Sequence, residues 1–179
     1  MIRLILLPLL FLSVSCSKDD NENDSTVNLY GLFQKDIDEA MLIHNNARSD
    51  VGVEDLKWSS SLANDAKEWA NKMAREEEMY HSENDERPGQ GENLYYSSGT
   101  DSITPAKNAS GAWYQEIELY TYSTTGSDEN DFYAIGHYTA MIWKETTEVG
   151  MGMAVSKSGK TYVAARYSPP GNMWGAYPY

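Results

Sequence analysis

Cysteine is almost absent from this chain, because Cys16 is the only one among 179 residues. No disulfide can form within a single copy, which excludes the small secreted scaffolds that depend on several of them. Roughly 150 residues follow the N-terminal segment, enough for one domain that buries about 68 to 70% of its unfolded surface. The fold is therefore expected to depend on its hydrophobic core alone.

Basic side chains are also scarce. The chain has 14 Lys and Arg residues against 27 Asp and Glu residues, and a net charge of −13. Removal of the first 15 residues would take away Arg3 and leave a net charge of −14. Such a field repels phosphate backbones and anionic lipid surfaces and attracts cations and basic partners. Nucleic acid is therefore excluded as a ligand.

No apolar run is long enough to span a bilayer, which needs ~20 residues. The N-terminal segment Met1–Ser15 has one early positive charge and then an apolar stretch from Leu4 to Leu12. This pattern predicts a signal peptide over residues 1–15. Cys16 directly follows it, where cleavage would leave a lipid attachment site, such as a palmitate site, at the new N-terminus. The expected product is a bacterial outer-membrane lipoprotein; secretion with a free Cys16 thiol is the alternative.

Residues 16–29 contain little that could be buried, and they are predicted to form a flexible acidic tether. Within the tether, Lys18-Asp19-Asp20 resembles the export tags that bring some bacterial lipoproteins to the cell surface. A plain hydrophilic spacer would have the same composition. The domain proper is expected over residues 30–179, anchored to the membrane through Cys16.

Apolar residues recur at helical spacing in four places. The first helix is expected over Leu32–Arg48, and the second after the hydroxyl residues Ser59–Ser61, ending near Glu76. The pair Thr104-Pro105 should open a third helix that runs to Tyr120. Gly136 should open a fourth that ends near Thr147. The intervening stretches Ser82–Ser98 and Thr121–Asp131 have no sustained period and are interpreted as loops.

One β-hairpin is predicted near the C-terminus. Residues 149–155 alternate Val or Met with Gly or Ala, and Ser158-Gly159 separates them from the run 161–167. The small residues all fall on one face of the first strand, which suits a closely packed helix. One mixed α+β domain, with helices packed on a sheet, is the simplest architecture.

Three short motifs resemble those of the CAP superfamily, which comprises the cysteine-rich secretory, antigen 5 and pathogenesis-related class 1 proteins. They are Gly91-Glu92-Asn93-Leu94, Gly136-His137-Tyr138-Thr139, and Tyr167 to Asn172; His44-Asn45 with Arg48 matches a fourth. The resemblance runs from about Leu32 to Asn172. It implies a three-layer α-β-α sandwich in a single SCP-like domain.

The resemblance also implies a tetrad across a central cleft, formed by His81, Glu92, Glu116 and His137. Two neutral imidazoles bind zinc or another divalent cation well, and the glutamates would either complete the ligand set or orient the imidazoles from behind. His-Glu-x-x-His, the strong metalloprotease motif, is missing. His44 is expected to be structural.

Three interpretations of the tetrad stay open on the sequence alone. The four residues form a polar network that shapes the cleft, they bind a cation, or they hydrolyse a bond through a metal-bound water with a glutamate as base. A serine mechanism through Ser82 or Ser168 lacks a Gly-x-Ser-x-Gly elbow. Catalysis is thus not established by the sequence, which favours a binding module.

The aromatic residues are mostly amphipathic, with 13 Tyr and 5 Trp against 3 Phe. Asn93 and Tyr138 are expected to line the cleft, and the resemblance implies sterols or lipids, besides glycans, as small ligands. Tyrosines packed in a half-wet interior would give the same composition. A further alternative is an adhesion or interaction protein that binds partner proteins through the loops Asp85–Pro88 or Ser127–Asp131.

Overall fold

The computed structural model describes residues 27–179. The predicted signal peptide, Cys16 and most of the predicted tether lie outside the described residues. The elements follow in the order α1 (Gln34–Asp50), β1 (Lys57–Trp58), α2 (Ser60–Glu76), β2 (Gly91–Ser97), α3 (Pro105–Gln115), the 3-10 turn η1 (Glu116–Leu119), α4 (Phe132–Met141), β3 (Glu148–Val155) and β4 (Thr161–Ser168). No helix among these residues combines the length and apolar character needed to cross a bilayer.

The sheet has four strands in the order β1-β3-β4-β2. Strands β3 and β4 form the predicted hairpin, with Glu148 opposite Ser168 and Val155 opposite Thr161. Strand β2 adds antiparallel to β4, and the short β1 adds parallel to β3. Strands β3 and β4 are buried along almost their whole length, so both faces of the sheet must be covered.

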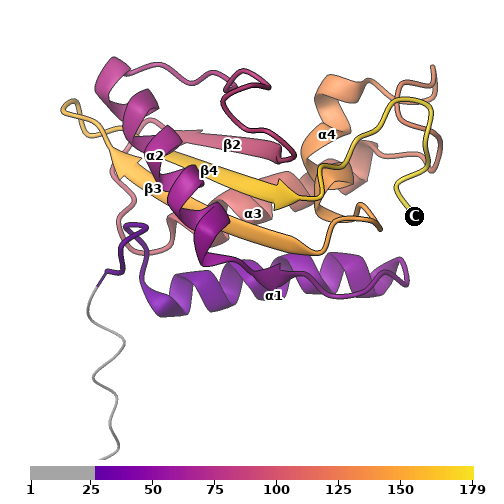
Figure 1. Ribbon diagram of the computed structural model, residues 1–179, viewed down its shortest axis with the longest axis horizontal. Coiled ribbons are helices and arrows are strands. Elements are labelled where there is room, and N and C mark those ends of the chain that lie inside the picture. Colours follow the sequence, from indigo (N-terminus) through magenta and orange to yellow (C-terminus); the bar gives the residue numbers. More distant parts are fainter. Residues whose placement is uncertain (1–26) are drawn as a thin grey trace, which may run out of the picture.

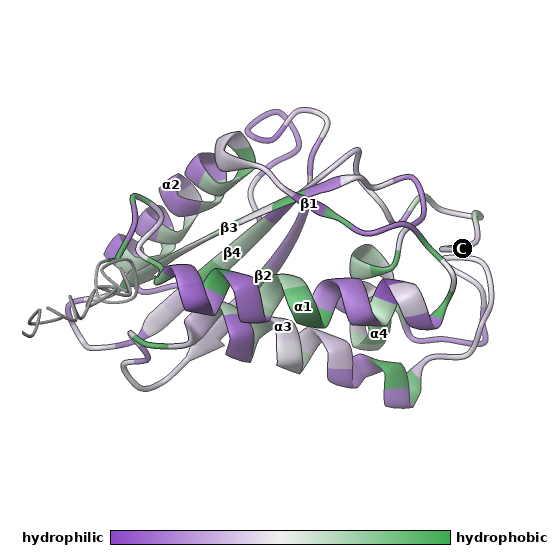
Figure 2. Cartoon of the chain, turned by 90° about the horizontal axis from the view of Figure 1, so that it is seen from below, coloured by the Kyte–Doolittle hydropathy of each residue, from purple (hydrophilic) through white to green (hydrophobic). Residues whose placement is uncertain are grey.

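Helix α2 covers one face of the sheet, and α1, α3 and α4 lie on the other (Figures 1 and 2). The expected three-layer α-β-α sandwich is thus confirmed. Small residues let α2 approach closely, since a Cβ on Gly150 would lie 2.2 Å from the backbone nitrogen of Ala63. The larger core, between the sheet and the other helices, includes Trp113, Met151 and Val163.

Three sequence predictions of local structure were wrong, and one of them is the end of the third helix, because α3 stops at Gln115 and η1 follows it in place of a continuation to Tyr120. Residues 91–97 form the strand β2 and not a loop. Helix α4 begins at Phe132, four residues before Gly136, because the Asp131 carboxylate accepts a hydrogen bond from the backbone N–H of Tyr133 and caps the helix. The helix also ends at Met141, well before Thr147.

Helix α1 carries buried polar side chains that join it to its neighbours. The Asp36 carboxylate accepts from the backbone N–H groups of Ala106 and Lys107, so it caps α3 in place of Thr104. The Arg48 guanidinium donates to four backbone carbonyls, those of Glu54, Met141, Trp143 and Thr146. Burial lowers the pKa of Arg48 to about 10. These bonds hold α1 against α3 and against the segment after α4.

His44 is fully buried on α1, and its hydrogen bonds fix its tautomer. Its Nδ1–H donates to the Ala40 carbonyl at 2.9 Å, so Nε2 accepts from the Tyr167 hydroxyl at 2.8 Å. No carboxylate faces the ring in these contacts. Burial therefore lowers the pKa of His44 to about 4. The structural interpretation of this histidine fits its position.

Acid is expected to weaken the fold through His44. The unfolded chain takes up a proton near pH 6.5 and the folded chain only near pH 4, so this contribution to stability is complete above pH 6.5 and is lost as the pH falls toward 4. The free energy of unfolding should drop by about 2 kcal/mol between pH 7 and pH 5 from this group. Urea unfolding at several pH values measures it. In His44→Gln, which cannot titrate, this part of the pH dependence should vanish; an unchanged slope would contradict the assignment.

Candidate functional site

The first half of the site joins the segment after α2 to strand β2. Nδ1 of His81 donates to Oε1 of Glu92 at 2.7 Å, and the Ser82 backbone N–H donates to the same oxygen. The other oxygen, Oε2, accepts from the Ser82 hydroxyl at 3.0 Å and lies 3.0 Å from Nη1 of Arg166. The side chains of Glu92 and Arg166 are 1% and 3% exposed. Glu92 is therefore a buried, fully bonded anion.

The second half joins η1 to helix α4. Nδ1 of His137 donates to Oε1 of Glu116 at 2.5 Å. The other oxygen of Glu116 accepts from the backbone N–H groups of His137 and Tyr138, both at 2.9 Å. The ring of Trp113 stacks on the His137 imidazole, with centroids 6.0 Å apart and planes 22° from parallel. Both the position and the plane of this imidazole are fixed.

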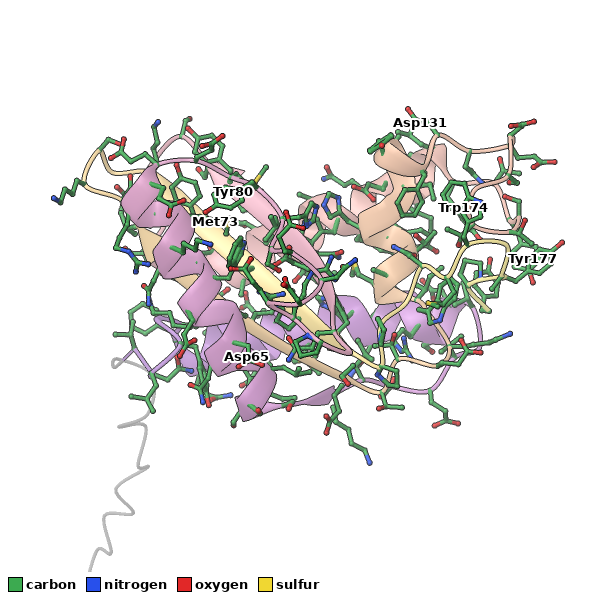
Figure 3. All side chains as sticks on the ribbon, turned by 45° about the horizontal axis from the view of Figure 1, so that its top comes forward. Asp65, Met73, Tyr80, Asp131, Trp174 and Tyr177 are labelled. Carbon is green, nitrogen blue, oxygen red and sulfur yellow. The ribbon has the colours of Figure 1, made fainter. Side chains whose placement is uncertain are left out.

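The two halves face one cleft of about 420 Å³. One wall includes the segment that follows α2, next to Tyr80 in Figure 3, and the other includes the first turns of α4, next to Asp131. The cleft is lined by His81, Arg87, Gly91, Glu92, Asn93, Phe132, Tyr133, Gly136, His137, Ala140, Pro170, Gly171 and Asn172. The structure therefore brings three of the four tetrad residues to one surface.

Two expected site residues do not line the cleft. Glu116 lies behind His137 and reaches the cleft only through it. Tyr138 is 1% exposed, and its ring packs against Tyr114 and Tyr120. Asn93 does line the cleft, where its amide nitrogen donates to the His137 carbonyl and the Tyr167 hydroxyl. Since Tyr167 also bonds His44, this chain of contacts ties the second imidazole to α1.

Both imidazoles have the same arrangement, with a carboxylate behind Nδ1. When the rings are neutral, this leaves Nε2 of His81 and Nε2 of His137 with free lone pairs. The His81 side chain is 59% exposed and that of His137 is 31% exposed, so solvent species can reach both rings. The site can therefore accept a cation or a hydrogen-bond donor from the cleft.

The geometry also bears on the hydrolytic alternatives. All the oxygens of both glutamates already accept hydrogen bonds from the protein. The Ser82 hydroxyl is occupied too, since it donates to Glu92 and accepts from Nη1 of Arg166 at 2.8 Å. Ser168 ends β4 and does not line the cleft. The glutamate oxygens and the Ser82 hydroxyl are thus held by protein hydrogen bonds, and the Ser168 side chain lies outside the cleft lining.

Sequence reasoning missed Arg166 and Trp113 as parts of the site, and it considered Ser82 only as a nucleophile, whereas the structure shows this serine bonded to Glu92 and Arg166. A signal existed for Arg166, because it is the only charged residue in the apolar strand 161–168. An arginine is rarely buried unless it is paired. The partner itself is Glu92, which lies opposite it on the neighbouring strand β2.

Comparisons with known proteins agree with this fold and motif set. Residues 42–167 match the model of the cysteine-rich secretory protein family, CAP. Pathogenesis-related protein 1C of Nicotiana tabacum is 36% identical over 137 residues, which is 76% of each chain. The human Golgi-associated plant pathogenesis-related protein 1 is 33% identical over 75% of this chain and 83% of its own length.

Among solved structures, that of NaASP2 with Zn²⁺ superposes with a TM-score of 0.73 and 25% identity, covering 86% of this chain and 90% of that one. The structure of Na-ASP-1 gives a TM-score of 0.71 and 25% identity, and covers 89% of this chain and 44% of that one. The shared sandwich and the family match over most of the described residues lead to one assignment. The chain belongs to the CAP family of cysteine-rich secretory, pathogenesis-related class 1 and venom allergen proteins.

Proposed function

We propose that the cleft binds a divalent cation, with zinc as the best candidate, through Nε2 of His81 and Nε2 of His137. The main support for this proposal is the carboxylate that accepts a hydrogen bond from Nδ1 of each imidazole. Histidines that hold metals almost always donate their other ring N–H to such a group, which fixes the tautomer and makes the ligand nitrogen more basic. A polar network without a ligand would not require both imidazoles to present the same free nitrogen to one cleft.

In this proposal the two glutamates bind the imidazoles and do not bind the cation directly. Their oxygens are already saturated with protein hydrogen bonds, so they orient the rings and do not complete the ligand set. Among residues 27–179 no group of three or more His, Cys, Asp or Glu side chains is arranged to hold a metal. A cation held by two imidazoles keeps other positions for water or ligand, so weak and exchangeable binding is expected. The zinc in NaASP2, a protein of the same fold, also supports this choice of metal.

The remaining positions on the cation would open into the cleft. Its α4 wall carries the rings of Phe132 and Tyr133, and Asn93 and Asn172 supply amide groups. Such a lining fits a small ligand with one polar end and an apolar or sugar-ring body. We propose that this ligand is recognised jointly by the cation and the cleft wall, with the protein acting as a binding module.

The place of action belongs to the same proposal. The apolar segment before Cys16 and the polar tether after it favour a lipoprotein of the cell envelope, anchored through an acyl group on Cys16. Labelling of the expressed protein with a fatty-acid analogue, lost in Cys16→Ser, tests the anchor. Cleavage by protease added to intact cells tests exposure at the surface.

Zinc is expected to stabilise the protein against unfolding, because it binds the folded site. At a free zinc concentration about 100 times the dissociation constant, the gain is about 2.7 kcal/mol. The double variant His81→Ala plus His137→Ala should lose this gain. A thermal melt with and without zinc measures it, and magnesium, which prefers oxygen ligands, should give little effect.

Two controls keep this test specific. His44→Gln leaves both cleft imidazoles in place, so it should retain the zinc-dependent shift from its own lower baseline. Circular dichroism of the double variant checks that it is folded, which is expected because both rings lie at the surface of the cleft. A zinc-dependent shift of equal size in the folded double variant, or none in the parent protein, would rule out the proposed cation site.

A further inference from the structure

The C-terminal segment presents Trp174 on a tight turn. Two backbone hydrogen bonds tie this segment to Thr125, whose N–H donates to the Ala176 carbonyl and whose carbonyl accepts from Gly175, both at 2.9 Å. The turn itself closes through the Ala176 N–H and the Met173 carbonyl at 3.0 Å. The C-terminal segment is therefore docked on the loop around Thr125. Even so, Trp174 remains 76% exposed.

The indole of Trp174 is held in place although it is exposed. A Cβ added to Gly126 would lie 2.3 Å from Cε2 of the ring, so the indole lies directly against the Gly126 backbone. Phe132 packs against it in a T-shaped arrangement, with centroids 6.2 Å apart. An exposed tryptophan that is fixed in this way loses little entropy when it binds a partner.

Phe132, Tyr133 and Trp174 form what we call the aromatic platform. Tyr133 is 93% exposed and its ring packs edge-on against Phe132. Figure 3 shows Trp174 on the same side of the molecule as Asp131, the residue that caps α4. Phe132 and Tyr133 also line the cleft, so the platform is continuous with its rim. Large exposed aromatic side chains gathered in this way mark interaction surfaces.

The segments that form the platform carry charge of one sign, and the arginine of the cleft lining, Arg87, belongs to the opposite wall, where it donates to the Ser82 and Gln90 carbonyls. The loop that leaves the indole at Gly126 and returns to it at Phe132 carries the exposed carboxylates of Asp128, Glu129 and Asp131. Within residues 27–179 none of the three forms a salt bridge. No Lys or Arg occurs between Thr121 and Trp143 or after Ser168. The platform therefore offers ring faces and negative charge without a cation of its own.

The opposite side of the cleft shows the contrast. There Nζ of Lys72 lies 4.3 Å from the ring centre of Trp69 and 5.6 Å from that of Tyr80, and it also pairs with Glu86. All the cation–π contacts found in the described part of the chain involve Trp69 or Tyr80. On the α2 side the chain thus supplies both the rings and the cation, whereas on the α4 side it supplies only rings and carboxylates.

From this complementarity we infer that the aromatic platform docks a basic segment of a partner protein at the rim of the cleft. Lys or Arg side chains of the partner would lie over Trp174 and Tyr133 and pair with Asp128 and Glu129, as Lys72 does with Trp69 and Glu86 within this chain. A membrane surface fits less well, because the net charge of −13 opposes anionic headgroups. The inference does not depend on the cation site, since no platform residue is one of its ligands.

Binding of an oligo-arginine peptide to the purified full chain tests the inference, with an oligo-glutamate peptide of equal length as the opposite-charge probe. Calorimetry should show binding of the arginine peptide alone, weakened by salt because the groups are exposed. Trp174→Ala should lower the affinity about threefold to tenfold, whereas Trp174→Phe, which keeps a ring, should retain most of it.

A matched pair of charge variants separates docking from general attraction to an acidic protein. The double variant Asp128→Asn plus Glu129→Gln should lose affinity about fivefold. Glu54→Gln plus Glu78→Gln removes the same charge from two exposed residues elsewhere on the surface, whose carboxylates form no salt bridge within residues 27–179, and it should bind almost as the parent does. Equal losses in the two charge variants, or undiminished binding by Trp174→Ala, would overturn the inference. Binding of neutral glycans or vesicles through Trp174, without binding of the basic peptide, would also overturn the inference.

Discussion

Alanine in place of Gly150 is expected to lower the free energy of unfolding by about 3 kcal/mol or more. The added methyl group would lie 2.2 Å from the backbone nitrogen of Ala63 and 2.6 Å from both the Leu62 carbonyl carbon and the Ser59 oxygen. All three are backbone atoms at the start of α2, so no side chain can move aside. The whole helix would have to withdraw from β3, and its packing on the sheet would be lost.

Gly111→Ala is the matched control, since it makes the same chemical change in the same domain. Nothing lies within 4 Å of a Cβ at that position, and Gly111 is inside α3. The variant should therefore gain about 0.5 to 1 kcal/mol from helix propensity. Urea unfolding of both variants measures the difference. A Gly150→Ala variant as stable as the parent would show that α2 does not rest on the strand backbone.

The same contact connects the fold to the site. Helix α2 ends at Glu76, and the segment that follows it delivers His81 to the cleft. If Gly150→Ala moves the helix, His81 should lose its place relative to Glu92 on the sheet. If zinc then stabilises this variant only slightly, the cause would be that the His81 imidazole has moved, although the residue itself is still present.

How far the fold could be predicted depends on how local its signals are. The β3–β4 hairpin has alternating residues and a Ser158-Gly159 turn within one short stretch, so its place and its small-residue face could be read from the sequence. Strand β2 was missed because Gly91–Ser97 does not alternate cleanly; its burial comes from β4, which lies about 70 residues further along the chain. Its pairing is long-range, and no local pattern specifies it.

The candidate site shows the same division. The motifs pointed to His81, Glu92, Glu116 and His137. The structure places His81, Glu92 and His137 in one cleft, and Glu116 lies behind the ring of His137. What the motifs could not supply is which groups surround the carboxylates. The partner of Glu92 depends on the register between β2 and β4, and the Trp113 stack depends on how α3 packs beside α4.

The pairing of Glu92 with Arg166 has consequences for stability. Both side chains are almost completely buried, at 1% and 3% exposure, and Nε of Arg166 has no hydrogen-bond partner among the described residues. Burial lowers the pKa of Arg166, which the Glu92 charge partly offsets. The guanidinium therefore depends on one carboxylate for most of its compensation in the low-dielectric interior. Removing that carboxylate leaves an unpaired buried charge.

Glu92→Gln is accordingly expected to cost about 3 to 5 kcal/mol of unfolding free energy, because it breaks a buried ion pair on one side only. Urea unfolding measures the loss. Glu86→Gln is the matched control: its carboxylate pairs with Lys72 at 3.2 Å but both side chains are partly exposed, so the cost should stay below about 1 kcal/mol. The double variant Glu92→Gln plus Arg166→Met removes both charges and should be more stable than Glu92→Gln alone.

These costs decide how Glu92 can be used as a probe of function. Had Glu92 been a free carboxylate at the cleft surface, Glu92→Gln would test a catalytic base without disturbing the fold. Because it is a buried anion that holds Arg166, Ser82 and His81 together, loss of any activity in that variant reports the loss of this cluster. Equal stability losses in Glu92→Gln and Glu86→Gln would contradict the buried pair and restore Glu92 as a candidate base; a clear difference leaves the imidazoles as the groups that face a ligand.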